Sequence, residues 1–233
     1  MQYYRTVQKN SLQQQWSVII ELAVTSDTRY LQEFYDNLLE NWQKQCKWCL
    51  NVFGQALTGT ACEPTIVLVE LLSTIEPTRE SLLTQCLKRS NDKLLILQEH
   101  SAANIQFGTN IGKLLSIEGN HPSSLIKSLS SAINNWFMVF INQYASMEQT
   151  YLTGIIGEIQ MVQTTAAESV RALGAANNKI VELCEEALKR CELITQDCGI
   201  PALLVVFNVR NFLCNVLFLK HKYFFTVYIQ NIS

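Results

Sequence analysis

Proline and glycine are scarce in this sequence, which contains only 4 prolines and 9 glycines among 233 residues. These two residue types mark most turns, so a chain with few of them has few turns and long secondary-structure elements. A β-sandwich built from many short strands is therefore disfavoured. The composition favours an all-α fold.

Charged residues are also few: they make up 16% of the chain, and the formal net charge is −2. Globular proteins usually carry about a quarter of charged residues, so glutamine, asparagine, serine and threonine must form much of the solvated surface here. The chain has no basic field that could attract phosphate backbones. We therefore expect no nucleic-acid binding.

The residue patterns of enzymes are missing. The three histidines, His100, His121 and His221, are far apart and lack the spacing of an HExxH zinc motif. The stretch GTNIGKL at 108–114 has three residues between its glycines, where a phosphate loop has four, and Leu114 stands where magnesium needs a hydroxyl. Neither a GxSxG elbow nor a pair of catalytic carboxylates is found. The sequence predicts no enzyme activity, no catalytic residue and no cofactor.

Eight cysteines raise the question of a disulfide, metal or redox site. The chain passes from MQYYR straight into polar helical sequence, so we expect no signal peptide and a reducing, cytosolic setting. Cys46 and Cys49 have CxxC spacing, but they lie inside a helical pattern without a second pair to complete four zinc ligands. Cys184, Cys191 and Cys198 are spaced about 10 Å apart along one helix face, too far for two thiolates to share a zinc ion. We predict no metal site and interpret these cysteines as packing residues of a heptad-like seam.

The longest helical pattern runs from Asp27 to Leu57, and the rest of the chain is organised around it. Its apolar residues recur at steps of three and four: Leu31, Phe34, Tyr35, Leu38, Trp42, Cys46, Cys49, Val52, Phe53 and Ala56. Asp27 can cap the first turn, and Gly54 lies where the helix should end. Trp42 is predicted to anchor a core or a subunit interface, whereas Trp48 lies off the stripe.

Similar patterns predict helices before and after this one. The expected helices are Tyr3–Val24, Pro64–Ile75, Thr78–Leu87, Lys93–Ile117, Ser123–Ile133, Ser146–Ile159 and Thr164–Gln196. The first is expected to form an antiparallel hairpin with the 27–57 helix. The aromatic run 136–140 fits either a buried helix or an extended segment. The predicted fold class is all-α, an elongated antiparallel helical bundle, with one helical-rod module over residues 1–199.

An apolar tail, residues 200–233, follows the predicted module. Its stretch Ile200–Leu219 has the length of a membrane span. Arg210 near the centre of this stretch would cost about 2.5 to 3.5 kcal/mol on an insertion scale. One alternative is therefore a single-span membrane protein with a cytosolic helical domain. A second alternative, a cysteine-dependent redox enzyme, needs a thiol of lowered pKa at Cys46 or Cys49.

Three segments resemble a known family. They are YYRTVQKNSLQQQW at 3–16, FYDNLLENWQKQCKWCLNVF at 34–53 and ANNKIVELCEEALKRCELITQDCGIPALL at 176–204. In this order they are similar to subunit seven of the conserved oligomeric Golgi tethering complex, up to about residue 206. Members of that family are much longer, so the chain resembles an internal fragment. The likeness fades after about residue 207, which suggests that the tail is a truncated or non-native end.

The resemblance implies a function. It implies a scaffold subunit bound peripherally to the cytosolic face of the Golgi membrane, with subunits five, six and eight of the complex as partners. Such a subunit would support retrograde vesicle capture within the Golgi and thereby protein glycosylation. The family resemblance carries no catalytic or metal-binding residue.

Overall fold

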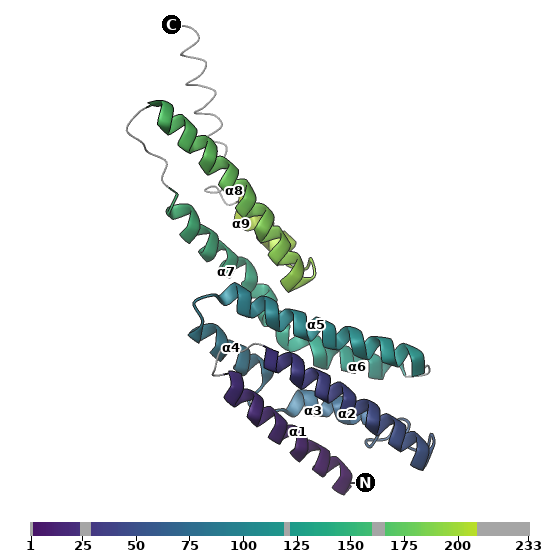
Figure 1. The fold of residues 1–233 in the computed structure, drawn as a ribbon. Helices are drawn as coiled ribbons and strands as arrows, with labels where there is room; N and C mark the ends of the chain where they lie inside the picture. The colour runs from purple at the N-terminus through teal and green to yellow at the C-terminus, as the bar shows by residue number, and fades with distance from the viewer. Residues whose placement is uncertain (1, 24–28, 119–121, 160–165, 209–233) are drawn as a thin grey trace. The chain divides into compact units, whose positions relative to one another are not determined.

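The structure is a computed structural model, and it describes residues 2–23, 29–118, 122–159 and 166–208. Every regular element within these ranges is a helix, so the all-α prediction is confirmed (Figure 1). The chain divides into two compact units, Met1–Val139 and Phe140–Ser233. This division falls inside the range predicted as one module, 1–199. The boundary at residue 199 and the elongated shape stay predictions.

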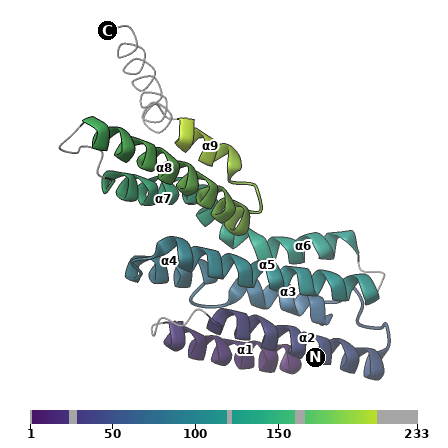
Figure 2. The ribbon, with the colours of Figure 1, turned by 45° about the horizontal axis from the view of Figure 1, so that its top comes forward.

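The first unit is a layered bundle built around α2. Its elements are α1 (Gln2–Ala23), α2 (Arg29–Phe53), α3 (Pro64–Thr74), α4 (Arg79–Arg89), α5 (Lys93–Glu118), α6 (Ser123–Asn134) and the 3₁₀ turn η1 (Asn135–Phe137). Helix α2 packs against α1, α3 and α5, and α3 packs against α6. Helices α1 and α2 lie side by side and run in opposite directions, as predicted (Figures 1 and 2). The predicted cap at Asp27 lies outside the described residues.

Local sequence signals place the starts of α3, α4 and α5. Pro64 is at the start of α3, where a missing N–H costs no hydrogen bond. The Thr78 side chain accepts a hydrogen bond from the Ser81 N–H at 3.1 Å and caps α4. The Asp92 carboxylate accepts one from the Leu95 N–H at 3.0 Å and caps α5. These caps agree with the predicted helix starts.

The stripe on α2 forms the middle of the first core. Leu31, Phe34, Tyr35 and Leu38 are buried with Trp42, and the Tyr35 ring stacks on Phe107 of α5 at 4.4 Å between centroids. The predicted helix extended to Leu57, but α2 ends at Phe53, and the last stripe residues, Val52, Phe53 and Ala56, are exposed. The chain leaves the helix at Gly54, whose φ of +56° is left-handed. Periodicity shows which side chains share a face, but a second element must still cover that face.

The second unit contains all but the first two residues of α7 (Met138–Gly157), together with α8 (Ala166–Thr195) and α9 (Ile200–Asn208). Helix α7 begins at Met138, so the prediction that this helix starts at Ser146 was wrong. The ambiguous run 136–140 forms the end of η1 and the first turn of α7. The sequence signal was weak because Asn134 and Asn135 interrupt the pattern without interrupting the helical path of the chain.

The junction between α8 and α9 corrects the predicted cysteine seam. Helix α8 ends at Thr195, and the left-handed residues are Gln196 and Asp197, with φ of +48° and +68°. This turn breaks the seven-residue register, so Cys198 is exposed and is not a core residue as predicted. Gly199 is needed for close packing, because a Cβ there would lie 2.8 Å from Thr195 Cγ2.

Most of the apolar tail lies outside the described residues. Only its first nine residues are described, as α9. Among the described residues, no helix is long and apolar enough to cross a membrane. The predicted span Ile200–Leu219, its Arg210 and the single-span alternative extend beyond residue 208 and stay predictions.

Candidate functional site

The two cysteines of the CxxC pair lie on α2, and neither is exposed. Cys46 is partly buried against the core and Cys49 is buried, both in α2. Burial, together with the nearby Cys62 thiol, raises the pKa of Cys49, which is the opposite of what a redox nucleophile needs. Among the described residues, no group of three or more histidine, cysteine, aspartate or glutamate side chains could hold a metal ion.

The two other chemical candidates have structural roles. The GTNIGKL stretch lies within α5, so its glycines form no phosphate loop. His100 is buried, its Nδ1 lies 2.9 Å from the Ile96 carbonyl oxygen, and its Nε2 lies 3.3 Å from the Tyr30 hydroxyl. Burial lowers the pKa of His100 to about 4, so the ring is neutral at pH 7 and fills the core. His121 and His221 lie outside the described residues.

The two tryptophans of α2 differ as predicted. Trp42 is 4% exposed and packs in the first core, whereas Trp48 is 46% exposed. Trp48 lies against Phe53 at 5.6 Å between ring centroids, and Leu50 and Val52 beside them are also exposed. The last turns of α2 therefore present an apolar surface to solvent.

A buried ion pair joins α7 to α8 in the second unit. Glu148 of α7 is fully buried, and Arg190 of α8 donates to both of its carboxylate oxygens, at 2.6 and 3.2 Å. The Tyr144 hydroxyl lies 2.9 Å from Glu148 Oε2 and 3.0 Å from the Ala187 carbonyl oxygen. Burial and the adjacent Glu148 raise the pKa of Tyr144 above its ordinary value, so its hydroxyl remains a donor. The cluster fixes the register of the two helices.

Helix α8 carries two apolar stripes, and the described residues cover only one of them. The buried stripe consists of Ala176, Ile180, Leu183, Ala187, Cys191 and Ile194. The second stripe, which we call the α8 seam, repeats in steps of four and three residues: Val170, Gly174, Asn177, Val181, Cys184 and Leu188. Val170, Val181 and Leu188 are between 40 and 47% exposed. This spacing is typical of a helix that packs against another helix along a heptad.

Asn177 adds a polar feature to the α8 seam. Its Oδ1 atom is buried, and no donor among the described residues lies within hydrogen-bond distance. Buried acceptors are normally satisfied, so this oxygen is suited to a donor from a partner. An asparagine in an apolar seam can fix the register of paired helices.

Sequence reasoning predicted no site residues and missed both the α8 seam and the ion pair. Glu148 and Arg190 are 42 residues apart, and no local pattern links them. The apolar residues of the α8 seam do occur at heptad spacing in the sequence, but that spacing led us to predict Cys184 as a core packing residue. Cys184 is in fact only partly buried.

Comparisons with known proteins give a consistent result. The family described as Golgi complex component 7 (COG7) matches residues 1–217. The chain is 37% identical over 214 residues to "Conserved oligomeric Golgi complex subunit 7" of Drosophila melanogaster, which covers 89% of this chain and 28% of the relative. Proteins of the same name from Bos taurus and Homo sapiens are each 24% identical over 206 residues, covering 87% of this chain and 26% of theirs. No solved structure matches the chain.

Proposed function

The chain belongs to the Golgi complex component 7 family, and from this membership we propose that it is a helical scaffold segment of a vesicle-tethering complex at the Golgi. The observation that carries the proposal is the family match across residues 1–217. The chain spans between a quarter and three tenths of the length of its curated relatives. It therefore corresponds to one part of such a subunit.

The work of a scaffold segment is to hold binding surfaces in place, and the α8 seam has the properties of such a surface. Its apolar side chains are exposed at heptad spacing, and the Glu148–Arg190 pair fixes the helix that presents them. Burying these side chains against a partner helix removes apolar area from water, which drives association. A helix of another subunit could also donate a hydrogen bond to Asn177 Oδ1.

The proposed partners are subunits five, six and eight of the same complex, and the proposed location is the cytosolic face of the Golgi membrane, without a membrane span. In this role the complex would capture retrograde vesicles within the Golgi, and glycosylation enzymes would keep their correct residence. We assign the chain no catalytic role. Its contribution is mechanical, through helix packing.

Co-expression of the chain with subunits five, six and eight tests the proposal. The wild-type chain is expected to co-purify with at least one of them, and Leu188→Glu, which puts a charge into the α8 seam, is expected to lose that subunit. Leu193→Glu is the matched control, because Leu193 is 53% exposed on the same helix but lies off the seam. If the wild-type chain captured none of the three subunits, the proposed function would be wrong.

A further inference from the structure

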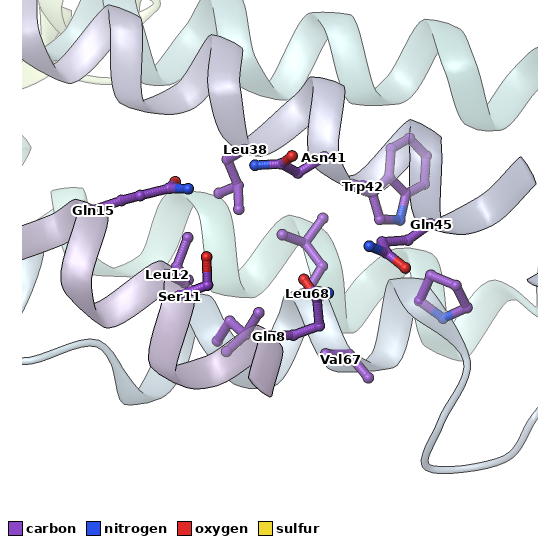
Figure 3. A pocket seen from close by; sticks show the side chains of 12 residues that line it. Gln8, Ser11, Leu12, Gln15, Leu38, Asn41, Trp42, Gln45, Val67 and Leu68 are labelled. Carbon is purple, nitrogen blue, oxygen red and sulfur yellow. The ribbon is translucent and has the colours of Figure 1, made fainter. Parts of the chain in front are cut away.

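The first unit contains a small groove between α1, α2 and α3, and the described side chains do not fill it. Figure 3 shows its lining, which includes Leu12 of α1, Leu38 and Trp42 of α2, and Leu68 of α3. Its remaining side chains are uncharged: Gln8, Ser11, Gln15, Asn41, Gln45, Pro64, Val67 and Leu71. The groove has a volume of about 50 Å³.

Trp42 leaves a polar atom unsatisfied at this groove. The side chain is nine-tenths buried, yet its Nε1–H has no acceptor among the described residues. In Figure 3 the nitrogen-bearing edge of the indole points toward the groove, near Gln45, and the six-membered ring points away. A buried donor without an acceptor costs about 1 to 3 kcal/mol, so native proteins rarely leave one.

The buried Trp16 and the partly buried Trp136 each have an acceptor for this N–H group within the chain. The Trp16 Nε1–H donates to the Pro77 carbonyl oxygen at 2.7 Å. The Trp136 Nε1–H donates to Asn104 Oδ1 at 3.3 Å. Trp42 differs from both because its Nε1–H has no acceptor among the described residues, and it is the tryptophan that lines the groove.

We propose that this groove receives one aliphatic side chain, of the size of leucine or methionine, from another subunit of the complex, and that a carbonyl oxygen of the same segment accepts a hydrogen bond from Trp42 Nε1. The inference rests on the proposed function and names a second contact surface, apart from the α8 seam. It is supported by the unsatisfied Trp42 Nε1–H, by the apolar side chains in the lining and by the uncharged polar side chains beside them.

Size and charge select this occupant. Pockets for cofactors and small molecules usually measure about 300 to 1,000 Å³, so a groove of about 50 Å³ is too small for them. The described residues that line the groove are all uncharged, so a phosphate, a carboxylate or an ammonium group would be desolvated there without a partner. A neutral side chain pays no such penalty. Gln8 and Asn41 also line the groove, and their amides can donate and accept hydrogen bonds.

Two substitutions test the groove in the full chain. Asn41→Asp keeps the shape of the lining but adds a charge, and we expect it to weaken the affinity for the captured subunit about tenfold or more. Asn51→Asp makes the same chemical change on an exposed part of α2 and is the matched control, with unchanged affinity. Affinities are measured by titrating the labelled chain with the purified subunit that it captures.

Replacing the Trp42 indole with benzothiophene, through a non-canonical amino acid, removes the N–H while keeping the shape of the ring. We expect affinity to fall about 2- to 10-fold, the effect of one neutral hydrogen bond, with no decrease in the melting temperature. The same replacement at Trp16 should lower the melting temperature, because that N–H has an intramolecular acceptor.

The outcomes separate the two proposals. If both the Asn41 and the Trp42 variants bound the subunit like wild type, the groove would hold only ordered water and this inference would be overturned, while the proposed function stood. If the wild-type chain captured no subunit, both proposals would fall together. Loss of affinity in both variants with Asn51→Asp unchanged supports the groove.

Discussion

Both units bury apolar side chains, but the described part of the second unit adds a buried ion pair and leaves an apolar stripe exposed. The first buries a continuous core of aromatic and aliphatic side chains from several helices, including Trp16, Phe34, Tyr35 and Phe107. In the second, α7 and α8 are joined through a buried carboxylate, Glu148, and its partner Arg190, while the α8 seam stays exposed. Apolar cores gain free energy from burial alone, whereas a buried ion pair mainly fixes geometry. We expect the first unit to fold by itself, and the α8 seam of the second unit to become buried on assembly.

The largest expected effect is in the first core. Trp42→Ala should lower the free energy of unfolding by about 3 to 5 kcal/mol, because it removes a buried ring and leaves a cavity. All four tryptophans, Trp16, Trp42, Trp48 and Trp136, lie in the first unit, so thermal unfolding followed by tryptophan fluorescence reports this unit alone. An unchanged fluorescence transition would mean that Trp42 is not a core residue.

The ion pair is the corresponding test in the second unit. Glu148→Ala should destabilise this unit by about 3 kcal/mol, because it leaves Arg190 and the Tyr144 hydroxyl without their carboxylate. The effect lies at the low end for a buried pair, since Arg190 is 18% exposed and keeps Glu186 at 3.7 Å. Glu186→Ala is the control, with an expected loss below about 0.5 kcal/mol because Glu186 is half exposed.

The readout of Glu148→Ala decides whether the units are independent. Far-ultraviolet circular dichroism follows helices in both units, so it should show an earlier transition in this variant. Tryptophan fluorescence should not shift. A fluorescence transition that moved together with the dichroism signal would show that the two units unfold as one, and the comparison would fail.

The pH dependence of stability should differ between the units. The folded pKa of His100 is about 4, below its ordinary value of 6.5, so in acid the unfolded state binds a proton that the folded state rejects. The stability from neutral His100 is therefore present above pH 6.5 and is lost as the pH falls toward 4. Between pH 7 and pH 5 the first unit should lose about 2 kcal/mol through this group.

A His100→Gln variant isolates that effect. Its fluorescence-detected unfolding free energy should fall less between pH 7 and pH 5 than that of wild type, because glutamine does not titrate. The described part of the second unit contains no histidine, so its transition should keep the wild-type pH dependence in the variant. Equal pH slopes for wild type and variant would show that His100 titrates normally in the folded state.

Sequence reasoning was most successful where short-range chemistry decides the structure. The caps at Thr78 and Asp92 and the position of Pro64 depend on residues within one turn, and the structure agrees with all three. It failed where burial depends on a distant element. Val52 lies on the predicted stripe of α2 but is exposed, and Cys198 lost its predicted register at a turn.

The candidate site was harder to predict for a related reason. Both stripes on α8 advance in steps of three and four residues, so sequence alone cannot tell which of them the chain itself covers. The α7–α8 ion pair joins residues far apart in sequence, and the unsatisfied Trp42 nitrogen depends on how three helices meet. These features arise from tertiary packing, which local sequence patterns do not report.

The smallest expected effect comes from the exposed apolar residues of the two units. Trp48 and Val181 are 46 and 47% exposed, so Trp48→Ala and Val181→Ala should each change the stability of the free chain by less than about 0.5 kcal/mol. The two variants should, however, differ in their affinity for a captured subunit. Val181→Ala removes a side chain from the α8 seam and should weaken binding, whereas Trp48 lies in neither proposed contact surface and Trp48→Ala should leave affinity unchanged. If Val181→Ala lowered the dichroism transition of the free chain as much as Glu148→Ala does, the α8 seam would belong to the core of the second unit. It would then be unavailable to a partner, and the contrast between a self-sufficient unit and an assembling one would be lost.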